Sequence, residues 1–71
     1  MEKNKPRTNL KLLRVSKKMT QAEFADFIGV DRGRYGQIES GKRNGRTDFW
    51  TKLQKAFPSA DIGGLMKVDE D

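Results

Sequence analysis

The 71-residue sequence contains no cysteine and no histidine. Without cysteine, no disulfide supports the fold and no thiol is available for catalysis. Without either residue type, we do not expect a zinc site or a Ser-His or Cys-His catalytic centre. The pairs Asp26 with Asp31 and Asp69 with Glu70 are close in sequence only, and helix capping and a solvated tail explain them. We therefore expect no metal, no cofactor, no small-molecule ligand and no enzymatic activity.

Long apolar runs are also absent. The apolar stretches are short, as in "DIGGLM", and none approaches the roughly 20 residues of a membrane span. The N-terminal "MEKNKPR" has no apolar stretch after its charges, unlike a secretory signal. We therefore expect a cytoplasmic protein with no membrane partner.

Basic residues, by contrast, are abundant. Fifteen Lys and Arg face ten Asp and Glu, which gives a formal net charge of +5. Residues 32–46 hold a dense group of cations with a single acid, Glu39. A basic segment of this kind suits a polyanion such as a nucleic acid, although a solvated surface is the simpler alternative. The cations of this segment are Arg32, Arg34, Lys42, Arg43 and Arg46.

One small domain at residues 8–67 accounts for most of the chain. The spacing of apolar residues predicts five helices within it, the first over residues 8–18. The polar residues 1–7 are predicted to form a flexible basic arm, and residues 68–71 an acidic tail. The expected helix N-caps are Thr8, Thr20, Asp31, either Thr47 or Asp48, and Ser59.

The second and third predicted helices have the clearest boundaries. "TQAE" has the form of a capping box, with Thr20 as N-cap and Glu23 three residues later. Gly29 stands where a left-handed residue ends a helix. Asp31 then caps a further helix, which ends at Gly41. Two short helices joined by a glycine-containing turn are typical of helix-turn-helix proteins.

The segment "MTQAEFADFIGVDRGRYGQIESGKR" resembles the helix-turn-helix of the lambda-type repressor and Cro family, also called the xenobiotic-response-element type. The resemblance implies an all-α, compact five-helix lambda-repressor-like domain whose helix-turn-helix is formed by the second and third helices. It extends over about 60 residues, because "FWTKLQKAF" and "SADIGGLM" fit the last two helices. The matching residues are Thr20, Gln21, Phe24, Ala25, Gly29, Val30, Asp31, Tyr35, Ile38, Glu39 and Gly41.

The same resemblance implies roles for individual residues. Exposed positions early in the third helix contact base edges in this family, which here are Arg32, Arg34 and Gln37. An ion pair between Arg14 and Glu39 is implied as a structural contact between helices. The residues expected to contact phosphates are Gln21, Lys42, Arg43 and Arg46.

Four residues depart from the family pattern. Gly33 and Gly36 lie within the third helix, where each costs about 1 kcal/mol relative to alanine. They either permit a close approach to a groove or partner, or are tolerated on an exposed face. Phe27 and Trp50 adjoin core positions, and they either complete the core or form an apolar contact surface.

Two functions are compatible with these residues. The favoured one is a small transcriptional regulator of a temperate-phage genetic switch, which binds double-stranded DNA in the bacterial cytoplasm and could act as a homodimer. The alternative is an antirepressor or modulator that binds a phage repressor protein through the same surface and alters its DNA binding. The residues assigned to such a partner interface are Phe27, Asp31, Gly33, Gly36 and Trp50.

Overall fold

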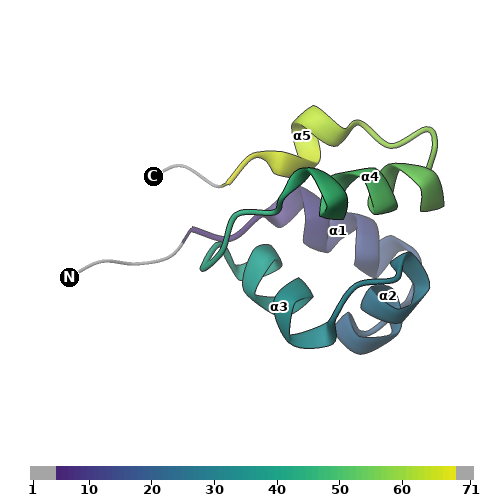
Figure 1. Ribbon diagram of the computed structural model, residues 1–71, viewed down its shortest axis with the longest axis horizontal. Coiled ribbons are helices and arrows are strands. Elements are labelled where there is room, and N and C mark those ends of the chain that lie inside the picture. The colour runs from purple at the N-terminus through teal and green to yellow at the C-terminus, as the bar shows by residue number, and fades with distance from the viewer. Residues whose placement is uncertain (1–4, 69–71) are drawn as a thin grey trace.

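The computed structural model describes residues 5–68, which form five helices and no strand. In Figure 1, α2 and α3 lie on one side and α4 and α5 on the other; α1 packs against α3 and α5, and α2 packs against α3 and α4. This arrangement confirms the predicted all-α fold with a central helix-turn-helix. None of these helices is long and apolar enough to cross a bilayer. The helices are α1 (Thr8–Ser16), α2 (Gln21–Ile28), α3 (Arg32–Ser40), α4 (Thr47–Ala56) and α5 (Ile62–Met66).

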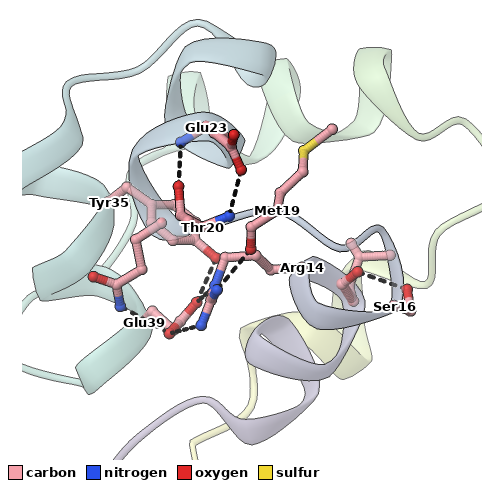
Figure 2. Close-up of polar contacts among 9 residues, drawn as sticks. Arg14, Ser16, Met19, Thr20, Glu23, Tyr35 and Glu39 are labelled. Atoms are coloured by element: carbon pink, nitrogen blue, oxygen red, sulfur yellow. Dashed lines mark hydrogen bonds and ion pairs between the residues drawn. The ribbon is translucent and has the colours of Figure 1, made fainter.

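The boundaries of α2 and α3 are those predicted from the sequence. The Glu23 backbone N–H donates to Thr20 Oγ1 over 3.1 Å, and the Thr20 N–H donates to Glu23 Oε1 over 2.9 Å (Figure 2). These two bonds complete the capping box. Asp31 caps α3, while Gly29 and Gly41 end α2 and α3 with positive φ angles of 83° and 87°.

The other helix boundaries were predicted less well. Helix α1 ends at Ser16 instead of residue 18, because the chain turns tightly there and Lys18 has a φ of 59°. Helix α5 starts later than a Ser59 cap would require, because the Ala60 N–H donates to the Phe57 carbonyl in a separate turn. The observed N-caps of α1, α4 and α5 are Arg7, Arg46 and Asp61, none of which caps through its side chain.

A single aromatic-rich core lies between the helices. The Phe24 ring lies 5.2 Å from that of Tyr35, and Trp50 meets Phe49 edge-on at 4.7 Å. Trp50 is only 6% exposed, so it completes the core, whereas Phe27 is 56% exposed. The prediction that these two aromatic residues complete the core is therefore confirmed for Trp50 but not for Phe27. The buried apolar residues are Leu10, Phe24, Ala25, Ile28, Tyr35, Ile38, Phe49, Trp50, Leu53 and Leu65.

A buried carboxylate joins α1, α2 and α3. Glu39 is 5% exposed and accepts four hydrogen bonds from three side chains (Figure 2). Arg14 donates from Nε over 3.0 Å and from Nη2 over 3.4 Å, and Tyr35 donates its hydroxyl over 2.6 Å. Gln21 donates its amide over 2.9 Å. The expected ion pair between Arg14 and Glu39 is therefore part of a larger network.

The network also sets the charge states of its members. Burial by itself would raise the pKa of Glu39, but the hydrogen bonds from Arg14, Tyr35 and Gln21 outweigh burial and hold that pKa below its ordinary value. Burial, and then the hydrogen bond to Glu39, raise the pKa of the Tyr35 hydroxyl. At neutral pH the tyrosine is consequently a donor and the glutamate an acceptor.

The start of the described chain is anchored, contrary to the prediction of a flexible arm that extends to residue 7. Arg7 is 4% exposed, and its backbone N–H donates to the Glu39 carbonyl over 2.8 Å. Its guanidinium lies 6.0 Å from the centre of the Trp50 ring, and burial lowers its pKa. The guanidinium donates to the carbonyls of Ile38, Arg43 and Met66 and to Asn44 Oδ1.

We predict that Glu39→Ala lowers the free energy of unfolding by about 3 kcal/mol, because Arg14, whose side chain is 13% exposed, would lose its carboxylate partner. Urea denaturation followed by circular dichroism measures this change. Asp26→Ala is the matched control, since it removes an exposed carboxylate that also pairs with an arginine. A loss for Glu39→Ala no larger than that for the control would contradict a stabilising role for the network.

The same variant should alter the dependence of stability on pH. Because the folded pKa of Glu39 is depressed, its stabilising contribution is complete above the ordinary value of 4.5 and is lost as the pH falls through the lower folded value. The wild-type protein should thus lose more stability than Glu39→Ala when the pH is lowered below about 4.5.

Candidate nucleic-acid interface

The buried apolar residues of α3 determine which of its other side chains face solvent. Tyr35 and Ile38 are fully buried, so the positions between them and before them face outward. Arg32 and Gln37 are exposed, and Arg34 is partly exposed. The structure therefore brings the three predicted base-contacting side chains to one helix, beside the turn from α2.

Both arginines at the start of α3 are paired with aspartates from neighbouring helices. Arg32 donates to Asp26 of α2, with Nε 3.2 Å from Oδ1 and Nη2 2.6 Å from Oδ2. Arg34 donates to Asp48 of α4, with Nη2 3.1 Å from Oδ1 and Nη1 3.3 Å from Oδ2. These hydrogen bonds lower the pKa of each aspartate.

The loop after α3 adds further cations beside these pairs. Arg43 donates from Nε to the Gln37 side-chain oxygen over 2.7 Å, while Lys42 and Arg46 are exposed. A polar hollow of about 380 Å³ is lined by Arg34, Arg43, Arg46 and Asp48. Three guanidiniums around one carboxylate leave an excess of positive charge that suits a phosphate.

The side chain of Gln21, which was predicted to contact a phosphate, is hydrogen-bonded within the protein. Its amide nitrogen donates to the buried Glu39 carboxylate instead of pointing into solvent. At the start of α2, the capping box already uses the Glu23 N–H and brings the Glu23 carboxylate to this helix end. Because Gln21 is exposed and its amide nitrogen has a second N–H, a phosphate contact is compatible with the bond to Glu39.

Two carboxylates at this surface were not identified from the sequence. Asp26 and Asp48 lie six and fourteen residues from their arginine partners. Neither separation matches the three- or four-residue spacing that brings side chains together on one helix. Only the packing of α2 and α4 against α3 and its flanking loop creates these pairs, so the local sequence contains no pattern for them.

The two unusual glycines of α3 accommodate neighbouring side chains of the protein itself. A Cβ at Gly36 would lie 3.3 Å from Gln21 Oε1, and one at Gly33 would lie 3.2 Å from Asp31 Oδ2. Asp31 Oδ2 accepts the Arg34 backbone N–H in the helix cap. Gly36 thus makes room for the glutamine that reaches Glu39, and Gly33 makes room for the cap.

Comparison with known proteins identifies a family for this chain. A family model described as helix-turn-helix matches residues 10–61, which is more than half of the chain and includes α2, the turn and α3. No curated protein and no solved structure gives a significant match.

We predict that alanine at each of three glycines has a different effect on the free energy of unfolding. Gly36→Ala should raise the free energy of unfolding by up to about 1 kcal/mol, because the helix gains propensity and the Gln21 side-chain oxygen can move aside. Gly33→Ala should have little effect, since the gain is offset by displacement of the Asp31 cap. Gly41→Ala should lower stability by more than about 1–2 kcal/mol, since its φ is 87° and the added Cβ would overlap the backbone carbonyl of Lys5. Urea denaturation separates these outcomes, and an equal loss at Gly36 and Gly41 would contradict them.

Proposed function

The chain belongs to the helix-turn-helix family, and from this membership we propose that it is a sequence-specific transcriptional regulator that places α3 in the major groove of DNA. The exposed first turn of α3 is the observation that carries this proposal, since it presents Arg32 to solvent while Arg34 of the same turn lies beside Arg43 and Arg46 of the following loop. Arginine can donate twice to guanine, and Gln37 can pair with adenine.

Phosphate contacts would set the position of α3 in the groove. Lys42, Arg43 and Arg46 lie on the loop that Arg7 holds against the core, so their backbone is placed before DNA arrives. Contacts of this type add affinity that depends on salt, without distinguishing one base from another.

We place this regulator in a temperate-phage genetic switch within a bacterial host, a proposal that is supported by the family resemblance of the helix-turn-helix. Regulators of this type commonly bind paired half-sites one helical turn apart. A homodimer would present two copies of α3 in that way. The exposed Met66 and Val68 at the end of the described chain are suitable for the dimer contact.

We predict that Lys42→Ala and Arg46→Ala each weaken binding to all duplexes to a similar extent and reduce the slope of log affinity against log salt by about one. Fluorescence anisotropy would compare a duplex enriched from a randomised pool with its scrambled version at several salt concentrations. Lys55→Ala, which removes the same charge from the opposite end of α4, is the control. Equal wild-type affinity for the enriched and scrambled duplexes at every salt concentration would exclude sequence recognition.

The second candidate is an antirepressor that binds a partner repressor through the same surface. Two observations favour it: Phe27 is 56% exposed beside the Phe57 ring, and Asp26 and Asp48 alternate with the arginines of α3. A mixed-charge surface with an exposed aromatic suits a protein partner better than it suits a uniform polyanion.

For this candidate, we predict a 1:1 complex with a repressor encoded beside the gene, measurable by calorimetry. Phe27→Ser should weaken the complex at least about tenfold, because aromatics near the centre of an interface contribute much of the binding energy. Leu12→Ser is the matched control, since Leu12 of α1 is 57% exposed and lies outside the helix-turn-helix. Absence of binding heat at micromolar concentrations would count against an antirepressor.

A further inference from the structure

The two arginines at the start of α3 are held by different edges of their guanidinium groups. A guanidinium has a side edge, formed by Nε–H and one Nη–H, and an end fork, formed by N–H groups of both Nη atoms. Either edge can donate two parallel hydrogen bonds. Which edge a carboxylate occupies therefore decides which edge is left for a base.

Asp26 occupies the side edge of Arg32. Its two oxygens accept from Nε over 3.2 Å and from Nη2 over 2.6 Å. The end fork remains unoccupied among the described residues, and the Arg32 side chain is 65% exposed. An arginine held in this way offers two parallel donors, which match the O6 and N7 acceptors of guanine.

Asp48 occupies the end fork of Arg34 instead. Its oxygens accept from Nη2 over 3.1 Å and from Nη1 over 3.3 Å, so both Nη atoms are engaged. The Arg34 side chain is also less accessible, at 28% exposed. Arg34 therefore connects α3 to the start of α4, and the side edge that Asp48 leaves belongs to a side chain that is largely covered.

We propose that Asp26 is a positioning residue that directs Arg32 to a guanine in the major groove, and that Arg34 contributes no base preference. This inference rests on the proposed DNA-binding function and narrows its base contacts from two arginines to one. It also makes α2 part of sequence recognition, because a carboxylate of α2 orients a side chain of α3.

Electrostatics explains why such a pair would favour specificity over affinity. An exposed ion pair is weak in water, but its attraction increases when DNA displaces the surrounding solvent. The Asp26 carboxylate also repels nearby phosphates, which lowers affinity for every duplex alike. Arg32 can offset this repulsion only where its fork meets two acceptors, so the pair penalises sites that lack guanine.

The test is selection from a pool of randomised duplexes with the full chain at one salt concentration, followed by sequencing. The wild-type protein should enrich guanine at one position of the site. Arg32→Lys should reduce that preference about tenfold, because an ammonium lacks the two parallel donors. Asp26→Asn should reduce it severalfold, while affinity for the unselected pool rises because a negative charge is lost.

Asp48→Asn is the matched control, since it removes an equally exposed aspartate that also pairs with an arginine. It should raise affinity for the unselected pool as Asp26→Asn does, but keep the guanine preference. An unchanged preference in Asp26→Asn, or an equal loss in Asp48→Asn, would overturn the proposal. Enrichment of no sequence by the wild-type protein would instead overturn the proposed function on which it rests. Both aspartates are exposed, and thermal melts would verify that the variants fold.

Discussion

The buried carboxylate of Glu39 is the constraint on which the arrangement of the first three helices depends. An anion that is 5% exposed is tolerated only if donors surround it, and these donors come from α1, α2 and α3 itself. Each of those helices must therefore present a particular side chain at one point. The orientation of α3 relative to α2, which defines a helix-turn-helix, follows from this requirement together with the apolar core.

The same carboxylate explains a feature that local propensity disfavours. Gln21 donates to Glu39 while its side-chain oxygen lies beside Gly36, where an added Cβ would be 3.3 Å away. A glycine at this point weakens the helix but leaves the network intact. Gly36 therefore borders the glutamine that reaches Glu39, and a side chain there would require that flexible glutamine to shift slightly.

The elements that could be predicted from sequence are those whose determinants are local. Thr20 and Asp31 accept backbone N–H groups within the next three residues, so their sequence positions define the starts of α2 and α3. Arg7 could not be predicted, because its partners lie between 31 and 59 residues away and include three backbone carbonyls. The pairing of Arg34 with Asp48 likewise depends on packing between α4 and α3. The sequence therefore identified the cations as candidates, but not the carboxylates that pair with two of them.

The distribution of charge at the site has a consequence for how it would bind a polyanion. An arginine that is already paired with an aspartate adds little net charge, so Arg32 and Arg34 contribute little to general attraction. Lys42, Arg43 and Arg46 have no carboxylate partner among residues 5–68, and they lie on a loop held by partly buried hydrogen bonds from Arg7. Non-specific affinity would thus come from the loop, and discrimination between sites from α3. Because non-specific affinity and discrimination between sites would come from separate surfaces, a substitution could change either property without changing the other.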